Sequence, residues 1–228
     1  MTNVMSKTKR IVALLLALLM MLSVVLVSCD ESYDDDDDDT YDKADKDDDS
    51  DEKAKFSRGE TDEDIYNNKY LGFKFEKPKS WIYSTDEEIA ELMNISVETF
   101  FDDKFKEALD KSGSIYDMMA RDTITGANVI VGYENLSKTY STNITEEQYA
   151  DAVKVNIAQA MGMEFEFDEY ETVKLGKTEF LRVSGSTTYN GSSMIQAYYL
   201  HKVDGYMAFV VVTIPRGYTL NEIEGMLK

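Results

Sequence analysis

The sequence has very few of the side chains that enzymes use as nucleophiles and metal ligands. Its 228 residues include one cysteine, Cys29, and one histidine, His201. A Ser-His-Asp arrangement would need His201 beside a nucleophilic serine, and no G-x-S-x-G motif is present. A catalytic zinc site needs two or three nitrogen or sulfur ligands, and phosphate or dinucleotide loops need glycine patterns that are missing. We therefore expect no catalytic residue, no metal site and no cofactor.

Basic side chains are also scarce. The chain has 24 Lys and Arg against 44 Asp and Glu, a formal net charge of −20. Nucleic-acid recognition depends on clustered Lys and Arg, so we expect no nucleic-acid partner. Direct adhesion to anionic lipid is disfavoured for the same reason.

The first 28 residues have the pattern of a secretory signal peptide. Lys7, Lys9 and Arg10 form a basic start without an acidic residue, and a leucine-rich run of 17 residues follows from Ile11 to Val27. A basic start, an apolar middle and a small residue before the cleavage point are typical of such a peptide. A retained membrane helix is the alternative, because 17 residues lie at the lower limit for crossing a hydrocarbon core of about 30 Å.

The residues around the single cysteine favour cleavage and lipid attachment. Leu26-Val27-Ser28-Cys29 resembles the bacterial lipobox, in which an aliphatic residue, a tolerant position and a small residue precede cysteine. The resemblance implies a diacylglyceryl group on the Cys29 thiol and anchoring at the extracytoplasmic face of a cell membrane, as in Gram-positive lipoproteins. Two acyl chains hold a protein stably, at about 0.8 kcal/mol per buried CH₂. Lipidation of Cys29 would leave no thiol for disulfides or thiolate chemistry.

A strongly acidic segment follows the cysteine. Residues 30–55 contain 15 acidic and 4 basic side chains, a net charge of −11. With so little apolar content the segment cannot offset the entropy of ordering, and we predict a disordered tether over 29–59 that spans at least about 25–30 Å. Calcium binding is the alternative, but calcium loops space their ligands and turn at a glycine, whereas Asp34 to Asp39 are consecutive.

Residues 60–228 are long enough to form one domain with its own core. The patterns predict strands at 65–66, 70–75 and 81–83, and then a helix opened by a Thr85–Glu88 capping box. A second helix is expected over 97–111, strands over 114–121 and 127–134, and a third helix after a Thr145–Gln148 capping box. A terminal helix is expected over 220–227.

The last third of the chain reads as a series of hairpins. Gly176-Lys177, Asn190-Gly191 and Asp204-Gly205 separate apolar stretches near 165–174, 178–188, 193–202 and 206–214. Such pairs favour tight turns, and they predict a four-stranded antiparallel meander. Residues 206–214 are apolar on both faces, so both sides of the sheet should be covered by helices. The expected fold class is α+β, an α/β/α sandwich with an antiparallel sheet and about three to four helices.

This order of elements is similar to the PsbP-like family. The resemblance is carried by a Tyr-x-Asn opening at Tyr66 and by Leu71-Gly72-Phe73-Lys74-Phe75-x-x-Pro78-x-x-Trp81, with the helices, hairpin and meander behind them. It covers residues 60–228 and implies the fold. The matching residues are structural, so no functional residue is carried over.

Two further groups of residues are candidates for chemistry or recognition. The first is a run of carboxylates that would suit glycoside hydrolysis if two of them flanked a cleft about 5–9 Å apart: Glu164, Glu166, Asp168, Glu169 and Glu171. A solvated strand face alternating with Phe165 and Phe167 is the favoured interpretation. The second is a set of tyrosines around the predicted turns that would suit protein or sugar recognition if they were exposed: Tyr189, Tyr198, Tyr199, Tyr206 and Tyr218.

These features favour a membrane-anchored extracytoplasmic lipoprotein whose domain is a non-enzymatic binding or accessory module, with a protein or cell-wall partner that the sequence does not identify. The alternatives are a carbohydrate-active hydrolase with paired carboxylates and a passive structural cell-surface protein. A cleft with two facing carboxylates would favour the hydrolase. An exposed apolar patch above a few hundred Å² would favour a protein partner.

Overall fold

The computed structural model describes residues 55–228 apart from 102–103, 162–163 and 190. The expected signal peptide (1–28), the lipidation residue Cys29 and the acidic segment up to residue 54 lie outside this part. In the part that is described, no helix is both long and apolar enough to cross a lipid bilayer.

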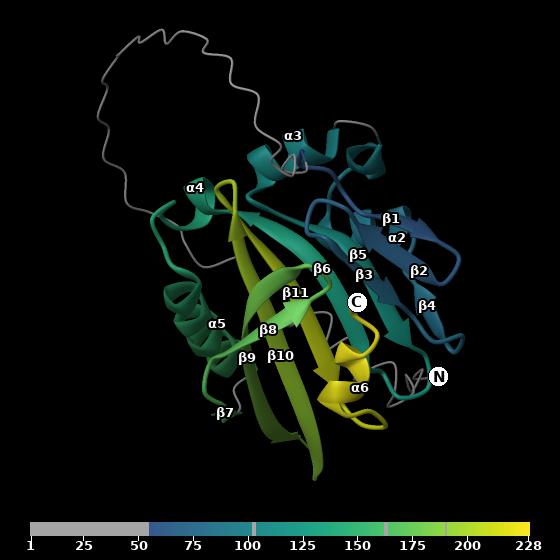
Figure 1. Ribbon diagram of the computed structural model, residues 1–228, viewed down its shortest axis with the longest axis vertical. Coiled ribbons are helices and arrows are strands. Elements are labelled where there is room, and N and C mark those ends of the chain that lie inside the picture. The colour runs from purple at the N-terminus through teal and green to yellow at the C-terminus, as the bar shows by residue number, and fades with distance from the viewer. Residues whose placement is uncertain (1–54, 102–103, 162–163, 190) are drawn as a thin grey trace, which may run out of the picture.

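The core of the domain is an eight-stranded sheet in which every pairing is antiparallel (Figure 1). Its order is β4-β5-β6-β11-β10-β9-β7, and β8 also pairs with β9. The strands are β4 (Trp81–Tyr83), β5 (Ser114–Asp122), β6 (Asn128–Asn135), β7 (Glu166–Phe167), β8 (Glu171–Leu175), β9 (Thr178–Tyr189), β10 (Ser192–Val203) and β11 (Tyr206–Ile214). Strands β8 to β11 form the predicted meander.

The turn between β10 and β11 shows why the meander could be predicted. Asp204 and Gly205 have φ values of 50° and 83°. Positive φ at both central residues is the geometry of a tight turn whose twist matches the flanking strands, and aspartate followed by glycine adopts it at low cost.

The strand expected over 165–174 is interrupted, and this prediction is corrected. Strand β7 pairs with Ser186 and Gly185, and β8 begins its pairing at Arg182 on the same strand, β9. The three residues 168–170 therefore lie opposite two residues of β9, Val183 and Ser184. One of the three has no partner in the ladder. Such a bulge ends the regular ladder between the two short strands.

Two of the helices begin at the predicted caps. They are α2 (Asp86–Met93), the 3₁₀ helix η2 (Val97–Phe100), α3 (Lys104–Ser112), α4 (Leu136–Thr139), α5 (Glu146–Met161) and α6 (Leu220–Glu224). Thr85 and Glu88 cap α2 reciprocally, and Thr145 and Gln148 do the same for α5 at 3.0 and 3.2 Å. Each box supplies partners for backbone N–H groups that the first turn leaves free.

The single helix expected over 97–111 is wrong. The chain forms η2, takes an extended conformation at Phe101, and begins α3 only at Lys104. Phe100 is the buried ring at this point, whereas Phe101 is half exposed. The apolar spacing through Phe101 suggested one continuous helix, but burial of Phe100 requires the break.

Both faces of the sheet are covered, and every residue of β11 is buried. On one face lie α4 and α5, and the end of α2 lies beside β5. On the other face lie α3, α6 and a small antiparallel sheet that was expected only as two short strands (Figure 1): β1 (Glu60–Asp62), β2 (Ile65–Asn68) and β3 (Phe73–Glu76). The α+β class with an antiparallel sheet is confirmed, and a three-stranded sheet shares the second layer with the helices.

The second layer also holds the start of the described chain. The ring of Phe56 lies 5.1 to 5.3 Å from those of Tyr70, Tyr133 and Tyr206. The Arg58 guanidinium donates to both carboxylate oxygens of Asp86 at 2.8 and 3.0 Å, and its Nε lies 3.3 Å from Asp117. The packing of the domain thus already includes Phe56, four residues before the expected boundary at 60.

Candidate ligand-binding site

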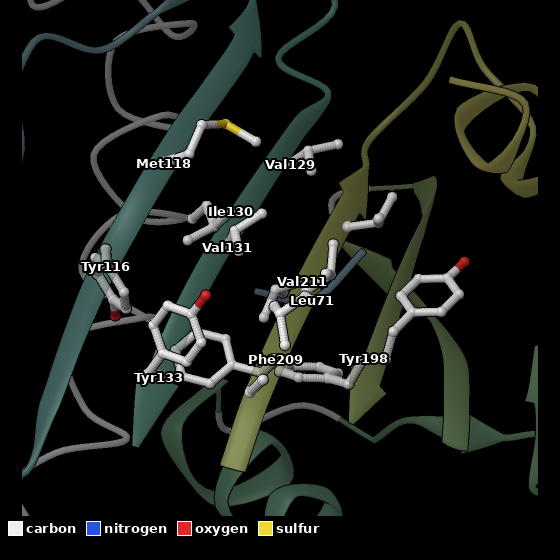
Figure 2. Packing of buried hydrophobic residues seen from close by; sticks show 14 of the residues in the cluster. Leu71, Tyr116, Met118, Val129, Ile130, Val131, Tyr133, Tyr198, Phe209 and Val211 are labelled. Carbon is white, nitrogen blue, oxygen red and sulfur yellow. The ribbon is translucent and has the colours of Figure 1, made fainter. Parts of the chain in front are cut away.

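A cavity of about 190 Å³ lies on the face of the sheet that carries α4 and α5. Its floor is formed by side chains of three strands of the central sheet, with Tyr116 on β5, Phe209 and Val211 on β11 and Tyr198 on β10 (Figure 2). Its apolar walls come from the end of α2 and the residues after it and from α5. These wall residues are Met93, Ile95 and Val153.

A glycine in the middle of β6 shapes this floor. Gly132 lies opposite Phe209 in the ladder, and a Cβ at this position would lie 2.5 Å from the Phe209 ring and 2.8 Å from the carbonyl oxygen of Ile115. Without a side chain at 132, the Phe209 ring lies close over β6, where it meets Tyr116 edge-on at 6.2 Å between centroids. A side chain here would force the Phe209 ring away from the strand and into the cavity. Gly132 therefore leaves space for the cavity above the sheet.

Among the described residues, one acidic group reaches the cavity, the carboxyl of Glu134 near the end of β6. Its side chain is buried, with the residue 7% exposed, and it accepts a hydrogen bond from the Tyr149 hydroxyl of α5. Burial raises the pKa of the Glu134 carboxyl, and the hydrogen bond from Tyr149 partly opposes this. Within the described ranges, Glu134 forms no ion pair with a basic side chain.

The remaining polar groups around the cavity are neutral hydroxyls. Burial raises the pKa of the phenols of Tyr116, Tyr149 and Tyr198, so each keeps its proton near neutral pH. Ser112, Ser114 and Thr139 add hydroxyl groups at the rim. The cavity is thus an apolar, aromatic space with one carboxyl at one end, which suits binding of a small molecule rather than a reaction that needs paired acid and base.

His201 does not reach this cavity. Its Nδ1 lies 3.8 Å from the Glu146 carboxylate at the start of α5, and its ring lies 5.4 Å from that of Phe180. No hydroxyl nucleophile is paired with it in the part of the chain that the structure describes. In the same ranges, no group of three or more His, Cys, Asp or Glu side chains is arranged to hold a metal ion.

The carboxylate run at the start of the meander also lies elsewhere. Glu164, Glu166 and Asp168 are exposed, while Phe165 and Phe167 between them are half buried and stacked at 5.7 Å. Glu171 forms an ion pair with Arg182. The interpretation of this run as a solvated strand face is confirmed.

The tyrosines around the meander are mostly not a recognition surface, and that hypothesis is corrected. Tyr198, Tyr199 and Tyr206 are buried because their strands are covered on both faces. Tyr218 is half buried and accepts a hydrogen bond of 2.9 Å from the indole of Trp81. The side chain of Tyr189 lies outside the described part.

Sequence reasoning missed Glu134 and gave Tyr149 no more than a place on the buried face of a helix. An acidic residue at the end of the apolar run 127–134 was the only local signal. Exposed apolar side chains gave no better lead, since Ile65, Ile82, Phe101, Ile124 and Val155 are scattered over separate elements.

No family model and no curated protein matches the chain. Among solved structures, it is similar to a protein of Bacteroides thetaiotaomicron (TM-score 0.36, 12% identity), over 67% of this chain and 42% of that one. It is also similar to the cyanobacterial PsbP of Synechocystis (TM-score 0.42, 13% identity), over 72% of this chain and 87% of that one. A third similar structure is LpqN of Mycobacterium tuberculosis, which is involved in cell envelope biogenesis (TM-score 0.36, 10% identity). The similarity covers 68% of this chain and 79% of that one. What the domain does is therefore inferred from its own residues.

Proposed function

We propose that this chain is a membrane-anchored extracytoplasmic lipoprotein whose domain is a non-enzymatic module that binds a small, largely apolar molecule. The cavity between the sheet and α5 is the observation that supports binding. It contains about 190 Å³, and an apolar cavity of about 150 Å³ is already large enough to hold benzene. The ligand would be about one ring with a few further atoms.

The lining of the cavity supports binding more than hydrolysis. A glycosidase needs two carboxyl groups on either side of the bond that is broken. Glu134 is the single acidic side chain among the residues that line the cavity, and the exposed carboxylates of β7 are not part of it. Aromatic rings and a small number of polar groups are typical of a binding pocket.

Binding can be tested by filling the cavity from one strand. Ser114→Phe places a ring at the cavity from β5, where an aromatic residue suits a strand. We expect full-length wild-type protein in detergent to bind benzyl alcohol saturably, and Ser114→Phe to lose this binding. The matched control is Ser193→Phe, an exposed serine on β10, which should bind as the wild type does.

Titration by calorimetry or by protein NMR measures the difference in benzyl alcohol affinity between these proteins. The absence of saturable binding of any small aromatic probe to the wild type would contradict the proposed function. Equal binding by Ser114→Phe and the wild type would place the binding outside this cavity.

The membrane anchor rests on the lipobox resemblance at Cys29. The acyl chains would hold the protein at the outer face of the membrane of a Gram-positive type of cell, and the acidic segment would separate the domain from it. We expect Cys29→Ser to release the protein or to leave an unprocessed precursor. Cell fractionation with mass spectrometry of the N-terminus is the measurement, and unchanged membrane association with normal processing would refute lipidation.

A further inference from the structure

Glu134 is a buried carboxyl for which the described part of the chain supplies no positive partner. The titratable groups that face it from the surrounding elements are the phenols of Tyr116 on β5, Tyr140 after α4 and Tyr149 on α5. Across the ladder, β11 presents Met207. All of these are neutral near neutral pH, and no described Lys, Arg or His side chain pairs with the carboxylate.

A buried carboxylate without a cation is unfavourable unless it takes up a proton or finds a positive partner. The hydrogen bond from Tyr149 occupies only part of its capacity, because a carboxylate has about four lone-pair sites. Glu134 can therefore accept further hydrogen bonds from a group that enters the cavity.

The surroundings of Glu134 favour a cation over a neutral or anionic group. Four aromatic side chains line the cavity, Tyr116, Tyr149, Tyr198 and Phe209, and the face of an aromatic ring attracts an ammonium ion. The domain as a whole is negative, since residues 56–228 carry 29 acidic and 17 basic side chains. This field raises the local concentration of cations and repels carboxylates.

We propose that the cavity selects a small organic cation, a primary ammonium group on an apolar body about the size of one ring, with Glu134 as its counter-charge. This inference rests on the proposed function of the cavity as a binding site. The apolar body lies over Phe209, Tyr198 and Val211, and the ammonium group donates hydrogen bonds to the Glu134 carboxylate. A charge-assisted hydrogen bond in a water-poor site gives the selectivity.

Three probes of one shape test the class of ligand: benzylamine, which is protonated below about pH 8, benzyl alcohol and benzoate. With the full-length protein at about pH 8, benzylammonium should bind about 10- to 100-fold more tightly than benzyl alcohol, and benzoate should not bind. Glu134→Gln should remove the preference for the amine, so that benzylammonium and benzyl alcohol bind with similar affinity. Glu166→Gln, an exposed strand glutamate, is the matched control and should retain the preference.

If Glu134→Gln does not fold, the pH dependence of binding to the wild type still tests the role of Glu134. The affinity for benzylammonium should fall as the pH is lowered and Glu134 takes up a proton, and it should fall more than the affinity for benzyl alcohol.

Two results would contradict the proposal in different ways. Saturable binding of benzyl alcohol with no preference for the amine, or a preference that survives Glu134→Gln, would refute the ligand class and leave the binding site standing. Failure of every probe to bind would refute the proposed function as well.

Discussion

Asp117 and Glu134 are buried carboxylates on neighbouring strands, β5 and β6, and they face opposite sides of the central sheet. Asp117 is 2% exposed and lies at a bulge, where the register shifts between Tyr116 and Met118. Its carboxylate accepts hydrogen bonds from the Tyr66 hydroxyl at 2.6 Å and the Gly59 amide at 2.8 Å, and it pairs with Arg58. Among the described residues, the partner of the Glu134 carboxyl is the Tyr149 hydroxyl.

The difference separates a structural carboxylate from a candidate binding carboxylate. The chain supplies a cation for Asp117, and through Arg58 this pair fixes the start of the domain to α2 and to the ring of Phe100, which lies 4.9 Å from the guanidinium carbon. For Glu134 the described chain supplies no cation and leaves a cavity beside it instead. Replacing the two residues should therefore have opposite effects on stability.

The largest effect is expected from Asp117→Ala. The change leaves Arg58, the Tyr66 hydroxyl and the Gly59 amide without their shared acceptor. Removal of one partner from a buried pair typically costs about 3–5 kcal/mol in the free energy of unfolding. Urea denaturation measures this, with Glu60→Gln as the control, because Glu60 belongs to an exposed ion pair with Lys69 and should change stability by less than about 1 kcal/mol. A loss similar to that of the control would contradict the structural role of Asp117.

A second, smaller effect on stability is expected from two deletions that differ in whether Phe56 and Arg58 are removed. Deletion of residues 30–59 removes Phe56 and Arg58 and should lower the melting temperature by several degrees, since about 1 kcal/mol corresponds to about 2–4 °C for a domain of this size. Deletion of 30–55 leaves both residues and should leave the melting temperature nearly unchanged. Calorimetry compares the two, and an equal drop in both would show that the acidic segment is part of the fold.

The smallest effect concerns Glu134 and pH. Because burial raises the pKa of this carboxyl above its unfolded value, the native state binds the proton more tightly than the unfolded state. The contribution of Glu134 to stability is thus fully present below its unfolded pKa of about 4.3, and it is lost as the pH rises through the folded pKa.

Glu134→Gln should therefore remove this loss of stability with rising pH. The variant should be at least as stable as the wild type at neutral pH. Denaturant titrations across pH 4 to 8 compare the two proteins. A large loss of stability in Glu134→Gln at neutral pH would mean that the charged form is needed to hold the fold, as at Asp117.

The parts of the fold that could be predicted are those with local causes. The capping boxes at Thr85 and Thr145 and the Asp204-Gly205 turn depend on residues within a few positions of each other, so composition and spacing were sufficient. The interruptions of predicted helices and strands were harder to predict. Neither the end of η2 at Phe101 nor the bulge at 168–170 has a local signal, because each depends on which side chains the packed core accepts.

The candidate site could not be predicted because its parts come together only in the folded sheet. The floor requires Tyr116, Tyr198 and Phe209 to lie on one face of three strands, and the register between β5 and β6 shifts within this region. The partners of Asp117 are equally remote, since Arg58 and Gly59 lie about sixty positions away in the sequence. Cys29 is the opposite case, because four consecutive residues carry its prediction.

The most direct test of the account is to locate a bound probe on the full-length protein by NMR. Benzylammonium should change the ring and methyl signals of Tyr116, Tyr198 and Val211 at the floor of the cavity, and in Glu134→Gln these changes should need about 10- to 100-fold more benzylammonium. Saturable changes confined to other parts of the domain, or none at any of these three residues, would contradict a binding role for the cavity beside Glu134.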